Sequence, residues 1–160
     1  MGPILANVTE KTIAGISVRT NNKAESNPKK AVLPTFWNRF FEEDILEQIP
    51  DKIPNSPIYG VYSEYESNVK GSYTVTAGVE AFGAKIKQNG FALSKIEGGE
   101  YLLFKGHGPM PEVVANTWQE VWNFFAKNKE FERCYQTDFE LYITQEEVEI
   151  YIGILKRPVT

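Results

Sequence analysis

The sequence is poor in the two residues that most often build metal sites and reactive centres. Its 160 residues include one cysteine, Cys134, and one histidine, His107. A single cysteine excludes an intrachain disulfide, and one cysteine with one histidine cannot supply the four ligands of a structural zinc site. A lone cysteine is also more often a small buried hydrophobe than half of a Cys–His catalytic pair. A reducing compartment fits this composition, and we expect a cytoplasmic protein.

Long apolar runs and clusters of basic residues are also missing. No segment is long and apolar enough to cross a bilayer, and the N-terminal residues lack the charged and apolar regions of a signal peptide. The formal net charge is -4, whereas nucleic acids and anionic membranes attract concentrated basic faces. The sequence therefore predicts no direct nucleic-acid partner and no membrane partner. Phosphate-binding glycine motifs are absent as well, so we expect no cofactor and no metal.

The overall composition is that of an ordinary globular chain with extra aromatic residues. Hydrophobic residues make up 42% and charged residues 24%, and the length suits one domain over residues 1–160 with a core at about 9–155. Aromatic residues reach 13%, with 3 Trp, 8 Tyr and 10 Phe. Such a number can fill a core, or it can line a cavity.

Hydrophobic periodicity predicts a β-α-β-β order that occurs twice. In the first half we expect a strand over 12–20, a helix over 31–49, and a hairpin of strands over 58–65 and 72–80. In the second half we expect a strand over 100–106, a helix over 110–127, and a hairpin of strands over 138–143 and 148–155. Two such units predict an α+β fold with pseudo-twofold symmetry. Its antiparallel sheet carries both main helices on one face, with a ligand cleft between the halves.

The two halves also match at individual residues. Trp37 in the first predicted helix corresponds to Trp118 in the second. Tyr59-Gly60-Val61-Tyr62 corresponds to Phe139-Glu140-Leu141-Tyr142. Side chains alternate along a strand, so Asp138, Glu140 and Tyr142 share one face, and Phe139, Leu141 and Ile143 share the other. We expect the apolar face to pack under the helices. Alternation alone leaves Glu140 either on a solvated face or in a pocket.

Several segments, in this order, resemble the gyrase-inhibitor-like small-molecule-binding domain. They are Tyr73 to Glu80, Gly98 to Pro109, and Phe139-Glu140-Leu141-Tyr142. The same domain forms the effector-binding part of many AraC- and MerR-type bacterial regulators. The resemblance covers about residues 9–155. Because no helix-turn-helix segment is visible in this sequence, we expect a stand-alone module rather than a direct transcription regulator.

The resemblance implies a site around Glu140. Multidrug-sensing members of the family hold lipophilic cations with a buried glutamate among aromatic rings, and the matching glutamate here is Glu140. Other members are hydrolases of strained, cyclopropane-containing compounds that use the same pocket glutamate. The candidate ligand-binding residues are Glu140, Trp37, Tyr59, Tyr62, Phe104, Trp118, Tyr142 and Tyr151. The remaining aromatic residues of the helices are expected to be core, namely Phe36, Phe40, Phe41, Trp122 and Phe125.

Three functions follow from these residues. The first is a binding module for lipophilic, cationic small molecules, which fits a carboxylate among aromatic faces. The second is a hydrolase in which Glu140 acts as base or nucleophile, since a buried carboxyl has a raised pKa. The third is a protein-interaction module that regulates another protein. Whether the chain is an enzyme, and whether it is a monomer or a homodimer, stays open at this point.

Overall fold

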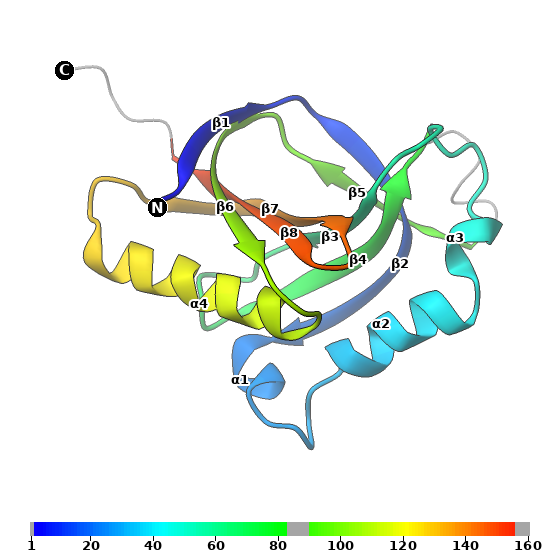
Figure 1. The fold of residues 1–160 in the computed structure, drawn as a ribbon, viewed down its shortest axis with the longest axis horizontal. Helices are drawn as coiled ribbons and strands as arrows, with labels where there is room; N and C mark the ends of the chain where they lie inside the picture. Colours follow the sequence, from blue (N-terminus) through cyan, green and yellow to red (C-terminus); the bar gives the residue numbers. More distant parts are fainter. Residues whose placement is uncertain (1, 83–89, 156–160) are drawn as a thin grey trace.

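Residues 2–82 and 90–155 are described by a computed structural model, in which eight strands form one antiparallel sheet (Figure 1). The strands are β1 (Ile4–Val8), β2 (Lys11–Asn21), β3 (Ile58–Ser63), β4 (Ser72–Glu80), β5 (Ala92–Ile96), β6 (Gly99–His107), β7 (Arg133–Thr144) and β8 (Glu147–Ile154). The helices are α1 (Asn22–Glu25), α2 (Leu33–Glu42), α3 (Ile45–Gln48) and α4 (Glu112–Lys127). The predicted α+β class is confirmed. The short strands β1 and β5 and the single-turn helix α1 were not predicted.

The sheet order displays the predicted internal repeat. It runs β1-β6-β8-β7-β3-β4-β2-β5, so the units β2-α2-β3-β4 and β6-α4-β7-β8 are arranged symmetrically about the β3–β7 pair. Within that pair the register runs from Ile58 opposite Tyr142 to Tyr62 opposite Asp138, with Gly60 opposite Glu140 in the middle. The pseudo-twofold axis therefore passes beside Gly60 and Glu140.

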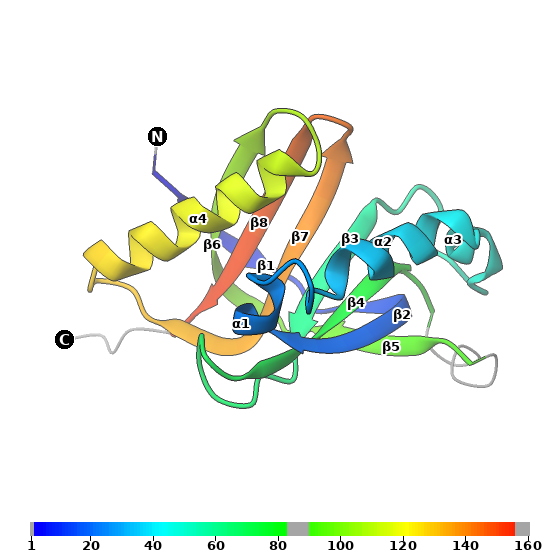
Figure 2. The same cartoon turned by 90° about the horizontal axis from the view of Figure 1, so that it is seen from below.

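The main helices lie on one face of the sheet, as predicted. Figure 2 shows α4 over β6, β8 and β7, and α2 with α3 over β3, β4 and β2. In α2 the buried residues are Phe36 and Phe40, spaced one helical turn apart. In α4 they are Val113, Thr117, Trp118 and Val121. None of the helices in the described part of the chain is long and apolar enough to cross a membrane.

The single helix predicted over 31–49 is instead two helices. α2 ends at Glu42 and α3 begins at Ile45, because Asp44 between them adopts a left-handed conformation with φ 50°. Aspartate tolerates this conformation better than most residues, which is why neither glycine nor proline is needed for the break. Ile45 and Ile49 are still buried, so the apolar spacing that predicted one helix is satisfied by two.

The face of the sheet that lies away from the helices is also buried, and this corrects one prediction. The edge strand β5 is hydrogen-bonded to β2, yet it also contacts β3 and β7, which shows that the sheet curls over on itself. Inside the curl lies a second apolar cluster that includes Phe139. Phe139 therefore does not pack under the helices as expected. Glu140 takes the helix-facing side.

Candidate functional site

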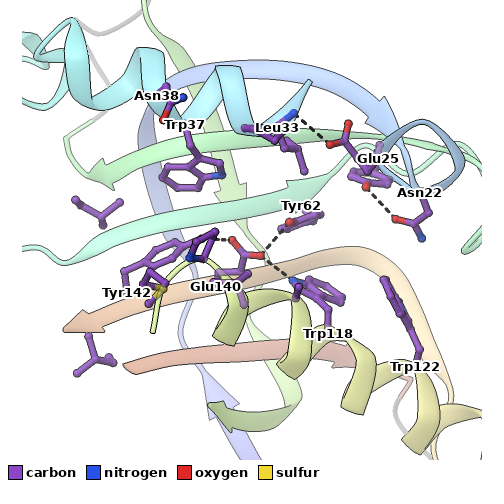
Figure 3. A pocket seen from close by; sticks show the side chains of 18 of the residues that line it. Asn22, Glu25, Leu33, Trp37, Asn38, Tyr62, Trp118, Trp122, Glu140 and Tyr142 are labelled. Carbon is purple, nitrogen blue, oxygen red and sulfur yellow. Dashed lines mark hydrogen bonds between the residues drawn. The ribbon is translucent and has the colours of Figure 1, made fainter. Parts of the chain in front are cut away.

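A cavity of about 1160 Å³ lies between α2 and α4, above the central strands (Figure 3). Its walls are built from corresponding positions of the two halves. The two main helices contribute four such pairs: Leu33 with Val114, Pro34 with Ala115, Trp37 with Trp118, and Phe41 with Trp122. The predicted cleft between the halves is therefore present, and it is lined mainly by apolar and aromatic side chains.

Glu140 from β7 lies at the floor of this cavity, and its carboxylate accepts three hydrogen bonds from neutral donors. The Tyr62 hydroxyl donates to Oε2 at 2.9 Å, and Trp118 Nε1 donates to the same oxygen at 2.7 Å. The Tyr142 hydroxyl donates to Oε1 at 2.7 Å. The side chain of Glu140 is thus surrounded by donors from β3, α4 and β7, and the residue is only 1% exposed.

Among the described residues, the charge of this carboxylate has no counter-charge. Within residues 2–82 and 90–155, no lysine, arginine or histidine forms an ion pair with Glu140. Burial raises the pKa of Glu140, and the hydrogen bonds from Tyr142, Trp118 and Tyr62 oppose that rise without cancelling it. Burial and the nearby charge of Glu140 also hold the pKa values of Tyr62 and Tyr142 well above the ordinary tyrosine value. Both hydroxyls therefore stay protonated and able to donate.

The pseudo-twofold axis explains why the cavity has one central carboxylate and not two. Gly60 is the residue of the first half that corresponds to Glu140, and the two lie opposite each other. A Cβ atom on Gly60 would lie 2.7 Å from Glu140 Oε1 and 3.0 Å from Trp37 Cζ2. The tyrosines next to this pair are retained in both halves, since Tyr62 and Tyr142 each donate to Glu140.

The structure brings five of the predicted site residues together around the cavity. Besides Glu140 they are Trp37, Tyr62, Trp118 and Tyr142. The Trp37 ring meets that of Tyr142 edge to face, with centroids 5.2 Å apart, and the rings of Tyr62 and Trp118 lie 5.0 Å apart. These contacts hold the aromatic donors in place around the carboxylate.

Three predicted site residues lie elsewhere, and two predicted core residues lie at the cavity. Tyr59 and Tyr151 pack around Phe139 on the opposite face of the sheet, because each alternates away from the helix side of its strand. Phe104 is on the helix side, but α4 covers it with Phe124 and Phe125. Conversely, Phe41 and Trp122 are not core, since they line the cavity and are 58% and 38% exposed.

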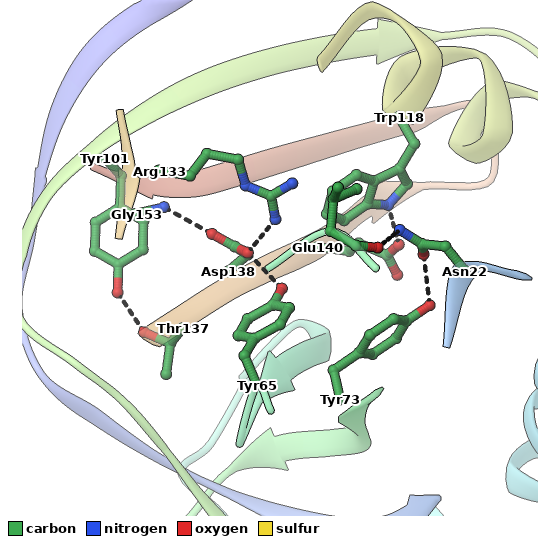
Figure 4. Close-up of polar contacts among 11 residues, drawn as sticks. Asn22, Tyr65, Tyr73, Tyr101, Trp118, Arg133, Thr137, Asp138, Glu140 and Gly153 are labelled. Carbon is green, nitrogen blue, oxygen red and sulfur yellow. Dashed lines mark hydrogen bonds and ion pairs between the residues drawn. The ribbon is translucent and has the colours of Figure 1, made fainter. Parts of the chain in front are cut away.

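A buried ion pair beside the cavity was missed by the sequence analysis. Arg133 Nη2 donates to Asp138 Oδ2 at 2.7 Å, and the hydroxyl of Tyr65 donates to the same oxygen (Figure 4). The backbone N–H of Gly153 donates to Oδ1 at 2.8 Å. Alternation predicts Asp138 on the same face of β7 as Glu140, but nothing in the sequence indicates that Arg133, five residues earlier, forms an ion pair with Asp138.

Glu25, another acidic residue that lines the cavity, is engaged in structural contacts. Glu25 Oε1 accepts from the backbone N–H of Leu33 at 3.2 Å, and Oε2 accepts from that of Val32 at 3.1 Å and from the Thr20 hydroxyl at 2.6 Å. Unsatisfied N–H groups at the start of a helix favour a carboxylate in this way. Glu25 therefore stabilises the start of α2, which leaves Glu140 as the buried carboxylate without a structural partner of opposite charge.

The fold and the cavity are those of a small-molecule effector-binding domain. The chain belongs to the family of integron-associated effector binding proteins, whose model matches residues 5–154. This confirms the resemblance to the gyrase-inhibitor-like domain, and it gives small-molecule binding as the general function.

Individual proteins resemble this chain over nearly its whole length. An integron cassette protein from the mobile metagenome of Vibrio cholerae is 32% identical, with 96% of each chain covered and a TM-score of 0.84. YobU of Bacillus subtilis (strain 168), which carries the name of a transcriptional regulator, is 28% identical over 153 residues, covering 91% of this chain and 93% of YobU. The structure of SAV2435 bound to tetraphenylphosphonium is 21% identical and shares the fold, with 97% and 94% of the two chains covered and a TM-score of 0.75.

Proposed function

We propose that this protein binds lipophilic organic cations in the cavity between α2 and α4, with the Glu140 carboxylate as the counter-charge. The observation that carries the proposal is a carboxylate that is 1% exposed, accepts three neutral hydrogen bonds and has no ion-pair partner in the described residues. A buried charge without a counter-charge is costly. A cationic ligand supplies the missing charge.

The walls of the cavity suit such a ligand in chemistry and in size. Aromatic faces attract a cation by about 0.5–2 kcal/mol each, and Trp37, Tyr62 and Trp118 all line the cavity. A volume of about 1160 Å³ accommodates a bulky molecule with several rings. SAV2435, which shares the fold, is bound to tetraphenylphosphonium, a cation of this kind.

The hydrolase alternative has one observation in its favour and one against it. The raised pKa of Glu140 suits a general acid or base. Glu140 Oε2, however, already accepts two hydrogen bonds and Oε1 accepts one, so one acceptor site is left, on Oε1, and the residue is almost fully buried. A nucleophile must reach bonding contact with the substrate through this one site, whereas a counter-charge acts without such contact. The arrangement therefore favours a counter-charge over a nucleophile.

A matched pair of probes tests the proposal. Methyltriphenylphosphonium and 1,1,1-triphenylethane have nearly the same shape and neither carries an oxygen acceptor, but only the first is charged. Isothermal titration calorimetry on the wild type should give tighter binding of the cation by at least about tenfold, since a desolvated charge pair contributes well over 1.4 kcal/mol. In Glu140→Gln the two affinities should converge. Equal affinities in the wild type would overturn the proposal.

A further inference from the structure

The cavity contains a second charged side chain whose hydrogen-bonding capacity the protein does not use up. Arg133 lines the same cavity as Glu140, and its side chain is 7% exposed. Its Nη2 donates to Asp138, whereas neither Nε nor Nη1 has an acceptor among the described residues. Nε is enclosed by the protein and Nη1 is not. Nη1 is therefore the donor that a bound molecule can reach.

An irregular stretch of β7 holds Arg133 at the cavity. The pairing of β7 with β8 shifts its register between Arg133 and Asp138, and Tyr135 within this bulge has φ 54°. A bulge re-aims the side chains next to it, and a left-handed conformation at a bulky residue is a strained conformation that the surrounding structure must hold in place. The guanidinium carbon of Arg133 lies 4.4 Å from the centre of the Tyr135 ring, which fixes the direction of the side chain.

The charge of Arg133 is already balanced, which decides what kind of group it can recognise. Asp138 accepts hydrogen bonds from Arg133, from the Tyr65 hydroxyl and from the backbone N–H of Gly153. The ion pair therefore has no uncompensated charge, and what remains free are the unused N–H donors of Arg133. A guanidinium in such a pair still donates strongly to an oxygen acceptor. A carbonyl oxygen and a carboxylate oxygen are both suitable partners.

Arg133 and Glu140 are close enough to act on one molecule. The Trp118 indole contacts both of them, because its Nε1 donates to Glu140 at 2.7 Å while the guanidinium carbon of Arg133 lies 5.9 Å from its ring centre. A short aliphatic tether bridges the width of one indole ring. Figure 4 shows Trp118 hydrogen-bonded to Glu140, with the Arg133 side chain nearby.

We infer that the cavity prefers cations that also carry a hydrogen-bond-accepting oxygen, with Glu140 holding the cationic centre and Arg133 holding the oxygen. The inference rests on the proposed function and adds an orientation to it. The preferred ligand is asymmetric, with its oxygen toward Arg133 at the β7 bulge and its cationic centre at Glu140.

Three probes with one cationic centre test the inference. They are pentyltriphenylphosphonium, which has no acceptor, (4-carboxybutyl)triphenylphosphonium, which has a carboxylate, and the primary amide of the latter, which has a neutral acceptor. Calorimetry on the wild type should show that at least one acceptor-bearing probe binds about tenfold more tightly than the pentyl probe, the gain typical of one hydrogen bond to a charged donor. The amide and the carboxylate together distinguish a hydrogen bond from a simple charge attraction.

The matched variant removes the donor without leaving a buried charge behind. In Arg133→Met/Asp138→Asn both charges are lost together and residue 133 keeps no donor, so the preference for acceptor-bearing probes should fall to less than about twofold. Affinity for the pentyl probe should stay close to that of the wild type. If this double variant does not fold, Arg133→Lys keeps the charge beside Asp138 but lacks the second guanidinium nitrogen, and it should also lose the preference.

The outcomes separate this inference from the function on which it rests. If the pentyl probe binds and Glu140→Gln weakens it, but neither acceptor-bearing probe binds more tightly, the role of Arg133 is overturned while the cation site stands. If the preference exists and survives in Arg133→Met/Asp138→Asn, the inference is overturned as well. If none of the probes binds, the cation site fails, and the inference fails with it.

Discussion

Gly60 and Glu140 face each other across β3 and β7, and the missing side chain of the first makes room for the carboxylate of the second. They occupy corresponding positions of the two repeats and are paired in the register of the sheet. A Cβ atom on Gly60 would lie 2.7 Å from Glu140 Oε1. Glycine on one side of the axis and glutamate on the other thus give the cavity one counter-charge at its centre.

This relationship predicts the effect of Gly60→Ala. The added methyl group must displace the Glu140 carboxylate or the Trp37 ring, so stability should fall by about 1–3 kcal/mol and cation affinity should fall with it. Chemical denaturation and calorimetry measure the two effects. Gly2→Ala, where a Cβ atom meets nothing within 4 Å, is the control and should change neither. Unchanged cation affinity in a folded Gly60→Ala protein would contradict the close contact.

Glu140→Gln should stabilise the ligand-free protein at neutral pH. The amide oxygen can accept from Tyr62 and Trp118, and the amide N–H can donate to the Tyr142 oxygen, so the three hydrogen bonds have replacements. Burial raises the pKa of Glu140 in the folded state. Its favourable contribution is therefore fully present below the ordinary glutamate pKa and is lost as the pH rises through the raised value.

The pH dependence makes this prediction specific. Thermal unfolding of wild type and Glu140→Gln should give similar midpoints at a pH below the ordinary glutamate pKa. As the pH rises toward 7, the variant should become the more stable of the two. A variant that is less stable than the wild type at pH 7 would show that the carboxylate is already well compensated by its neutral donors.

Replacing either of the two neighbouring tryptophans of α4 with phenylalanine should have very different effects on stability and cation affinity. Trp118 donates to Glu140, whereas Trp122 is 38% exposed and packs beside Trp118 with centroids 6.2 Å apart. Trp118→Phe removes a donor to a buried charge and should cost about 1–3 kcal/mol in stability or cation affinity. Trp122→Phe should cost less than about 1 kcal/mol. Equal effects would mean that the indoles act only as apolar wall.

Tyrosine-to-phenylalanine substitutions should weaken cation binding on the cavity side of the sheet but not on its opposite face. Tyr62→Phe removes a hydrogen bond to Glu140 and should weaken cation binding several-fold. Tyr59→Phe and Tyr151→Phe should leave affinity unchanged, since both side chains pack around Phe139 away from the cavity. Phe139→Ala, in contrast, should destabilise the fold by about 3–5 kcal/mol. Calorimetry on the three tyrosine variants decides whether the face assignment is correct.

Periodicity and repeat matching were enough to predict the order of the main elements and the cleft between the halves. They also put Glu140 and Tyr142 on one face of β7 and Phe139 on the other. They could not predict which face of the sheet packs against the helices, because the curled sheet buries both faces. The face that carries Phe139 lies inside the curl. The same limit explains why Tyr59 and Tyr151 were expected in the pocket.

Local irregularities were beyond what the sequence pattern could indicate. The break between α2 and α3 depends on the left-handed conformation of Asp44, and the position of Arg133 depends on a bulge that contains Tyr135. Neither feature is marked by glycine or proline, which are the usual signals of such conformations. Strands of five residues, such as β1 and β5, are also too short to give a clear alternation.

The central claim is that Glu140 is the counter-charge for a bound cation, and the pKa of Glu140 tests it most directly. The ¹³Cδ chemical shift of Glu140, assigned by its absence in Glu140→Gln, can be followed through a pH titration of the free protein and of the protein saturated with methyltriphenylphosphonium. A nearby cation favours the ionised form, so the pKa should be raised above the ordinary value in the free protein and should fall in the complex. An unchanged or higher pKa in the complex would contradict the account.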